Sequence, residues 1–173
     1  MVELKIAVEA DYPAVIALTN RAFRGTGAEA SWNVEDVIEG DRITDELLRE
    51  DLAQAPGGYL LMWRDDDGDH LGHVRLEPLA DGVWYLALLT VRPDRQDQQL
   101  GRRLLTAAED FARDRGARRI RMTVVNTRDT LIAWYGRRGY ALTGETLPFP
   151  YHDERIGRPT RDDLSFVVLE RAI

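Results

Sequence analysis

The residues best suited to chemistry lie where a predicted strand passes through a proline-containing turn into a helix. They form the segment LLTVRPDRQDQQLGRRLL at residues 88–105. The first N–H groups of a helix lack intrahelical partners and carry partial positive charge, so a phosphate or pyrophosphate can bind there without a charged side chain. Gly101 would let such a group approach the backbone closely. The segment therefore predicts an anion site at a helix N-terminus.

Two arginines, Arg102 and Arg103, fall in the first turn of this predicted helix. Cations at that end oppose the helix dipole, and an anion bound at the N-terminus would offset the repulsion. Two exposed arginines without a ligand explain the pattern equally well. The sequence leaves both interpretations open.

The spacing of this segment resembles the acyl-CoA-binding motif of the GNAT superfamily of N-acetyltransferases. Val91-x-Pro93 precedes Gln96-x-x-Gln99-x-Gly101, and the usual family form is Arg or Gln, two residues, Gly or Ala, one residue, Gly or Ala. Gln99 departs from this form, because it stands where the first small residue is expected. The backbone should then be harder for a pyrophosphate to approach, which predicts weaker CoA binding or a shifted loop.

A second segment resembles the same family. Asn126 follows the strand-like run RIRMTVV, and LIAWYGRRGY then places Tyr135, Gly139 and Tyr140 as the family's downstream helix does. The resemblance is best over residues 83–140. It implies acetyl-CoA as co-substrate.

The resemblance implies which residues hold the CoA. Leu89 and Val91 would pair through their backbone with the pantetheine arm, as an added strand does. Asn126 would either hydrogen-bond the CoA or cap the helix that begins near Arg128. The predicted pyrophosphate loop and helix start comprise Gln96, Asp97, Gln98, Gln99, Leu100, Gly101 and Arg102.

The catalytic groups are predicted from the same comparison and from proton chemistry. Tyr135 matches the tyrosine that protonates the departing thiolate in the family; core packing is its alternative role. Direct acetyl transfer needs an uncharged amine, so a carboxylate acting through water should remove a proton from the ammonium group. Glu77, at the end of a predicted strand, is our candidate base. The alternative carboxylates for this role are Glu35, Glu145 and Asp153.

Aromatic residues in two loops are candidates for the acceptor pocket. Phe23 and Trp32 border the polar segment RGTGAEASWNVED, and Phe149 and Tyr151 lie in a long loop predicted over residues 145–163. In the family these regions contribute to acceptor binding. Simple packing is an equally good explanation of all four side chains.

Hydrophobic periodicity predicts the elements that position these residues. Three neighbouring strands at 59–64, 71–77 and 83–91 suggest an antiparallel meander, and the clearest helix ends before Gly116. The fold class expected is α/β with a mixed sheet: a central, mostly antiparallel sheet with a splayed parallel strand pair, flanked by helices. The other predicted strands are 4–8, 120–125, 140–144 and 164–170, and the helices are 12–23, 45–54, 100–115 and 131–138.

Length and composition limit the alternatives. The 173 residues suggest one domain over 1–173, and a net charge of −7 disfavours nucleic acid and anionic membranes as partners. The absence of cysteine excludes thiol nucleophiles, and the N-terminus lacks the apolar run of a signal peptide, so a cytoplasmic protein is expected. His70 and His73 should point to opposite faces of one strand, so we predict no metal site.

The sequence thus predicts an N-acetyltransferase that moves an acetyl group from acetyl-CoA directly to a primary amine of a small molecule or peptide. The main alternative is a non-catalytic acyl-CoA sensor with the same fold. A nucleotide-binding enzyme is disfavoured, because neither a Gly-Lys-Ser/Thr phosphate loop nor GxGxxG is present. The negative net charge is mildly compatible with a cationic acceptor. The family resemblance also allows a homodimer.

Overall fold

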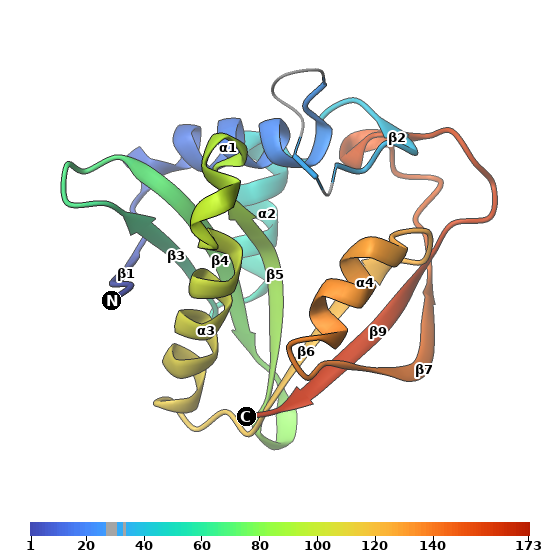
Figure 1. Ribbon diagram of the computed structural model, residues 1–173. Coiled ribbons are helices and arrows are strands. Elements are labelled where there is room, and N and C mark those ends of the chain that lie inside the picture. Colours follow the sequence, from blue (N-terminus) through green and yellow to red (C-terminus); the bar gives the residue numbers. More distant parts are fainter. Residues whose placement is uncertain (27–30, 33) are drawn as a thin grey trace.

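The structure is a computed structural model that describes residues 1–26, 31, 32 and 34–173. Strands and helices alternate along most of this chain (Figure 1). The helices are α1 (Tyr12–Arg24), α2 (Asp45–Gln54), α3 (Leu100–Arg113) and α4 (Asp129–Gly136). The strands are β1 (Leu4–Ile6), β2 (Ile38–Glu39), β3 (Tyr59–Arg64), β4 (His70–Pro78), β5 (Val83–Val91), β6 (Arg119–Val125), β7 (Ala141–Pro148), β8 (Arg158–Pro159) and β9 (Ser165–Ala172).

Seven strands form one mixed sheet in the order β1-β3-β4-β5-β6-β9-β7. Every neighbouring pair is antiparallel except β5 and β6, which run parallel. The α3 helix crosses the β3–β5 half of the sheet, and α4 lies over the β6–β9 half (Figure 1). This arrangement confirms the predicted mixed sheet with one parallel pair. The described helices include none long and apolar enough to cross a membrane.

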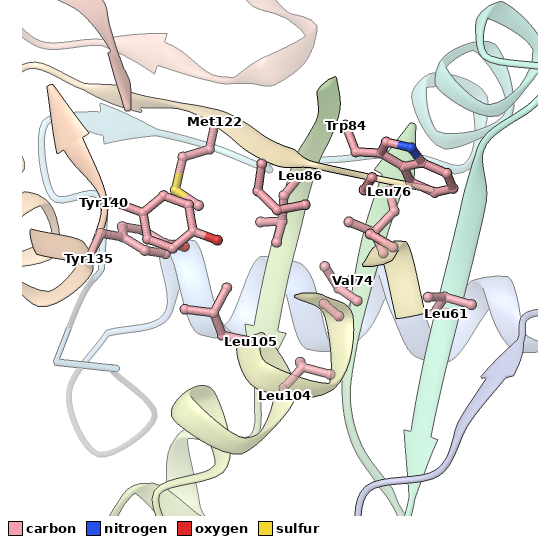
Figure 2. Close-up of a cluster of buried hydrophobic side chains, with 14 of the residues drawn as sticks. Leu61, Val74, Leu76, Trp84, Leu86, Leu104, Leu105, Met122, Tyr135 and Tyr140 are labelled. Atoms are coloured by element: carbon pink, nitrogen blue, oxygen red, sulfur yellow. The ribbon is translucent and has the colours of Figure 1, made fainter. Parts of the chain in front are cut away.

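Both faces of the sheet are buried, because alternate residues of β3 enter two different cores. Leu61 and Trp63 join the core beneath α3, whereas Leu60 and Met62 join the core beneath α1 and α2. Figure 2 shows Leu104 and Leu105 of α3 directed at the apolar side chains of the sheet. The α3 helix is amphipathic and ends close to Gly116, as its periodicity predicts.

A β-bulge in β5 separates β5 from its parallel neighbour. His73 pairs with Thr90 and Arg75 pairs with Ala87, so one residue of β4 faces two of β5. Leu88, inside this bulge, has a φ of +53°. A bulge increases local twist and bends its strand. Pairing of β5 with β6 covers only residues 83–85 against 119–121, and beyond them the two strands diverge (Figure 1).

Two late segments differ from the sequence prediction. The strand expected to stop at Gly144 continues to Pro148, because a bulge around Gly144, whose φ is +85°, lets β7 resume its pairing with β9. The predicted irregular loop also contains β8, which pairs with β2 in a separate two-stranded sheet. Two-residue strands are too short to give a periodic signal.

The prediction that His70 and His73 point to opposite faces is wrong. Their rings stack with centroids 5.2 Å apart, and His73 Nδ1 lies 3.2 Å from His70 Nε2. The register of β4 against β3 shifts between His70 and Gly72, and the extra residue reverses the strict alternation on which the prediction rested. His73 Nε2 lies 2.8 Å from the Thr19 hydroxyl on α1.

Candidate active site

A cavity of about 870 Å³ occupies the region where β5 and β6 diverge. Its wall comes from the end of α1 and the following loop, β5, the start of α3, β6, α4 and the segment after β7. The cavity therefore reaches both faces of the sheet, since α1 and α3 pack on opposite faces. Among the described residues, no group of three or more acidic or histidine side chains is placed to hold a metal ion.

The β5 wall leads directly to the N-terminus of α3. Leu89 and Val91 both line the cavity, and they lie beyond the part of β5 that pairs with β6. The first hydrogen bond of α3 runs from Arg103 N to Gln99 O over 3.1 Å. The N–H groups of the three residues before Arg103 therefore precede the helical ladder and can bind an anion. Leu100, Gly101 and Arg102 supply these groups and line the cavity.

Gln99 adopts a backbone conformation that usually favours glycine. Its φ of +55° and ψ of 32° place it in the left-handed region, immediately before α3. A side chain is disfavoured there, which gives the family's small residue at this position a conformational reason as well as a steric one. At Gly101 a Cβ would stand 3.4 Å from Trp134 Cζ2, which is van der Waals contact, so a side chain larger than a methyl group would meet the Trp134 ring.

The two arginines of the first α3 turn have different surroundings. Arg103 lies over the Trp63 ring, 4.9 Å from its centroid, in a cation–π contact. Arg102 lines the cavity beside the helix N-terminus. Arg138 lines the same region from α4 and stacks on Trp134 at 3.7 Å. Arg102 and Arg138 therefore add positive charge at the α3 end of the cavity.

Tyr135 of α4 lines the cavity and is 6% exposed. Its ring makes edge contacts with Trp134 and Tyr140, at centroid distances of 5.0 and 5.6 Å. Burial raises the pKa of its phenol well above the usual range, and Arg128 and Arg138 oppose this shift only in part. The phenol therefore keeps its proton at neutral pH, which a general acid requires.

The four candidate bases occupy different places. Glu77 lies on β4 opposite Tyr85 in register, and its carboxylate accepts a hydrogen bond from Arg75 at 2.5 Å. Tyr85 lines the cavity, whereas Glu77, its partner on the neighbouring strand, lies outside the described wall. Glu145 accepts from Arg121 at 2.6 Å, and Asp153 accepts from Arg155. Of the four, Glu35 is the one that lines the cavity as described.

Three of the four predicted acceptor-pocket aromatics come together. Phe23, Trp32 and Phe149 all line the cavity, although they come from three separate segments. Tyr151 lies outside the described wall, 40% exposed, and its hydroxyl accepts a hydrogen bond from Leu164 N at 2.8 Å. Its contact with Phe149, with centroids 5.0 Å apart, makes it a support for the pocket rather than part of its surface.

Of the two roles left open for Asn126, capping of α4 is wrong. The residue preceding α4 is Arg128, whereas the Asn126 amide accepts from Ser165 N and donates to Asp163 O, both at 3.1 Å. Asn126 thus ties the end of β6 to the start of β9, outside the described cavity wall. Gln98 is exposed and also lies outside that wall. The side chains of Gln96 and Asp97 fall outside the described part of the structure.

A charged cluster in the cavity was missed in the sequence analysis. The Glu35 carboxylate lies within 4 Å of guanidinium nitrogens of Arg24, Arg42 and Arg128. All four residues line the cavity. They are too far apart in the sequence to form a motif, and no spacing could have revealed them.

Comparisons with known proteins agree with this architecture. The Acetyltransferase (GNAT) family model matches residues 14–140. No curated protein sequence matches the chain. An IAA acetyltransferase from Bacillus cereus is similar in structure, with a TM-score of 0.68, 15% identity and 100% of both chains covered. A ribosomal-protein-alanine N-acetyltransferase from Brucella melitensis is also similar, with a TM-score of 0.69, 19% identity and 99% of each chain covered.

A third similar structure contains the expected co-substrate. A GNAT family acetyltransferase from Elizabethkingia anophelis, with acetyl-CoA bound, has a TM-score of 0.60 and 15% identity over 75% of this chain and 84% of that one. At these identities the structural matches establish the fold. The family model, which spans most of the chain, establishes the relationship. The chain belongs to the GNAT acetyltransferase family.

Proposed function

We propose that the protein is an acetyl-CoA-dependent N-acetyltransferase that acetylates a primary amine of a small molecule or peptide by direct transfer. One observation carries the proposal: the diverging edge of β5 leads into the open N-terminus of α3, and Tyr135 lies in the same cavity. A strand edge suits the amides of a pantetheine arm, and a helix N-terminus suits a pyrophosphate. A direct route also fits a chain without cysteine.

The residues present fit acetyl-CoA. Leu89 and Val91 would hold the pantetheine arm through their backbone, and the N–H groups at the start of α3 would hold the pyrophosphate, with Arg102 and Arg138 adding charge. Asn126, tied to β9, has no part in this proposal. When bound, acetyl-CoA supplies an activated thioester, whose carbon–sulfur bond breaks as the carbon–nitrogen bond to the amine forms.

Two groups of the chain handle protons. Tyr135 gives its phenolic proton to the departing sulfur, and the raised pKa of Tyr135 means that the phenol holds a proton to give at neutral pH. Glu77, through water and next to Tyr85, takes one proton from the acceptor's ammonium group. The second proton that leaves the nitrogen restores the Tyr135 phenol. The products are an amide, a thiol and one proton released to solvent.

The first experiment is calorimetric titration with acetyl-CoA, with CoA and ATP alongside. We expect micromolar binding of both CoA forms and much weaker binding of ATP. Gly101→Ala should weaken CoA binding without lowering the thermal midpoint, because its methyl group would stand at van der Waals distance from Trp134 while adding bulk at the N-terminus of α3. Gly136→Ala is the matched control, since Gly136 is also a helical glycine and nothing lies within 4 Å of its Cβ position. No binding of acetyl-CoA would overturn the proposal.

A thiol-release assay with a panel of amines then separates the enzyme from the sensor. Turnover with any amine, lost in Tyr135→Phe, supports catalysis. Tight acetyl-CoA binding without turnover of any amine would favour the non-catalytic sensor on the same fold.

A further inference from the structure

A buried carboxylate outside the cavity joins three segments of the fold. Glu109 lies on α3, is 4% exposed, and takes no part in the chemistry described above. Its Oε1 accepts a hydrogen bond from the Tyr140 hydroxyl at 2.8 Å. Both carboxylate oxygens also accept from Arg171 Nη1 on β9, at 2.8 and 2.9 Å. Glu109 therefore connects α3, the turn between α4 and β7, and the last strand of the sheet.

Tyr140 has no surface in the cavity. It is 3% exposed and lies outside the described cavity wall, as do Glu109 and Arg171. Burial and the neighbouring Glu109 carboxylate raise the pKa of the Tyr140 phenol, so this phenol stays a hydrogen-bond donor at neutral pH. Tyr140 can therefore affect a bound ligand only through another residue.

The cavity residue that Tyr140 contacts is Tyr135. The two rings meet edge to face, with centroids 5.6 Å apart (Figure 2). Tyr140 N also donates to Tyr135 O at 3.2 Å, because the chain turns back after α4 through Gly139, whose φ is +93°. Arg171 packs against the same turn, since a Cβ on Gly139 would stand 3.1 Å from Arg171 Nε. Ring and backbone contacts thus join Tyr140 to Tyr135.

The orientation of Tyr135 depends on these neighbours. Tyr135 is the buried residue of α4, which has eight residues, and a helix this short is held in place by its packing. The Tyr135 ring makes edge contacts with Trp134 and Tyr140. Trp134 lines the cavity, whereas Tyr140 is fixed in the core by its hydrogen bond to Glu109. Tyr140 is therefore the neighbour that ties the Tyr135 ring to the rest of the fold.

The need for stability explains the Glu109 carboxylate poorly. Replacing a buried ionic group by apolar side chains of similar volume is often neutral or stabilising, so such a group is weak evidence of a stabilising role. Hydrogen bonds to a carboxylate are short and directional, which suits it to fixing the position of a donor such as Tyr140. The other buried residues of α3 are apolar: Leu100, Leu104, Leu105, Ala108 and Ala112.

We infer that Glu109 and Tyr140 are positioning residues, which hold the Tyr135 phenol in the direction needed to protonate the departing sulfur. The inference rests on the proposed acetyltransferase function and adds two residues to it. The helix that begins at the predicted pyrophosphate site also carries Glu109, so one rigid element sets the distance between CoA and the phenol. A misplacement of about 1 Å can lower a rate by about a hundredfold.

Tyr140→Phe tests the inference, because it removes one hydroxyl and keeps the ring. We expect kcat in the thiol-release assay to fall about tenfold, with KM and the acetyl-CoA dissociation constant within about twofold. Thr19→Val is the matched control, since it removes a buried hydroxyl that lies 2.8 Å from His73 Nε2 and outside the described cavity wall. Both variants should lower the thermal midpoint by about 2–4 °C. Only Tyr140→Phe should lower kcat.

A double-mutant cycle shows whether Tyr140 acts through Tyr135. The Tyr135→Phe protein lacks the proton donor, so adding Tyr140→Phe to it should lower kcat by less than about twofold. A general loosening of the cavity would instead lower kcat by the same factor in both backgrounds. The size of the second effect therefore separates positioning of the phenol from a merely structural role.

Glu109 variants test the carboxylate end of the same contact. Glu109→Gln keeps an oxygen that accepts from Tyr140, so kcat should stay within about threefold of that of the unsubstituted protein. Glu109→Leu removes the acceptor and should lower kcat about tenfold, as Tyr140→Phe does. If Glu109→Leu does not fold, Tyr140→Phe and the double-mutant cycle decide.

The outcomes separate this inference from the proposed function. Absence of turnover by the unsubstituted protein with every amine refutes the function, and the positioning role with it. Turnover that Tyr140→Phe leaves unchanged, or lowers equally in the Tyr135→Phe background, overturns the positioning role alone. A loss of acetyl-CoA affinity that accounts for the whole fall in rate overturns it as well.

Discussion

Replacing Gln99 by glycine should stabilise the fold and strengthen CoA binding. Gln99 is exposed, makes no capping hydrogen bond with its side chain, and has a φ of +55° at the start of α3. A non-glycine residue in this region costs about 1–2 kcal/mol. Glycine adopts the same conformation without that strain and leaves the helix N-terminus open to a pyrophosphate.

The expected gain is smaller than the strain that is removed. Glycine gives the unfolded chain more freedom, which costs about 0.5–1 kcal/mol. The net stabilisation should be about 0.5–1 kcal/mol. A chain of 173 residues has an unfolding entropy of about 0.36 kcal/mol per kelvin, so the thermal midpoint should rise by about 1–3 °C. The dissociation constant for acetyl-CoA should fall a few-fold in the same variant.

Gln98→Gly is the matched control, because Gln98 is exposed and precedes the left-handed residue. It carries the same entropic cost without relief of strain, so it should destabilise by about 0.5–1 kcal/mol. Urea unfolding of both variants then isolates the conformational difference, expected to be about 1–2 kcal/mol. If the two variants lose equal stability, the strain argument is refuted. If Gln99→Gly gains stability but binds acetyl-CoA more weakly, the Gln99 side chain itself contacts the ligand.

Three further predictions follow from single positions. Tyr135→Phe should lower kcat about a hundredfold while leaving the acetyl-CoA dissociation constant nearly unchanged; equal rates across the neutral pH range would reject the acid role. Gly72→Ala should destabilise by about 1–3 kcal/mol, because its Cβ would stand 2.6 Å from Thr90 O. Gly136→Ala, with nothing within 4 Å, should instead stabilise the protein in the same urea assay. Burial holds the pKa of His73 well below its usual value. Below pH about 6.5 the unfolded chain binds a proton at His73 that the folded protein does not. The free energy of unfolding should therefore fall by about 1.4 kcal/mol for each unit by which the pH is lowered. His73→Gln should reduce that slope in unfolding curves measured between neutral and acidic pH and leave the part due to His70, whose pKa burial also lowers. An unchanged slope would exclude His73 as a source.

Periodic patterns predicted the parts of the fold that bury a continuous apolar stripe. The bounds predicted for α2, β3 and β5 agree with the structure, because these elements alternate or repeat without interruption. The divergence of β5 from β6 was implied only by the family resemblance. It depends on a bulge at Leu88, and a leucine at positive φ gives no local signal of one. The same loss of strict alternation in β4 brought His70 and His73 together.

The site was predictable where one segment supplies it and unpredictable where tertiary contacts assemble it. The residues from Leu89 to Arg102 that line the cavity lie in one strand–turn–helix unit, so the resemblance of that one segment to the family was enough to predict them. Asn126 matched its motif, yet the neighbouring strand β9 takes both polar atoms of its side chain. Nothing in the sequence indicates that preference, because β9 lies almost forty residues farther along the chain.

The charge of the acceptor illustrates the same limit. The whole chain carries −7, which by itself favours a cationic acceptor. Surface charges act through solvent and are screened within about 8 Å at physiological salt. The Glu35 carboxylate lies within 4 Å of guanidinium nitrogens of Arg24, Arg42 and Arg128 in the cavity wall, where the effective dielectric constant is lower than in water. The charges that line the cavity therefore bear on the acceptor more directly than the net charge of the chain does, and no spacing in the sequence indicates them.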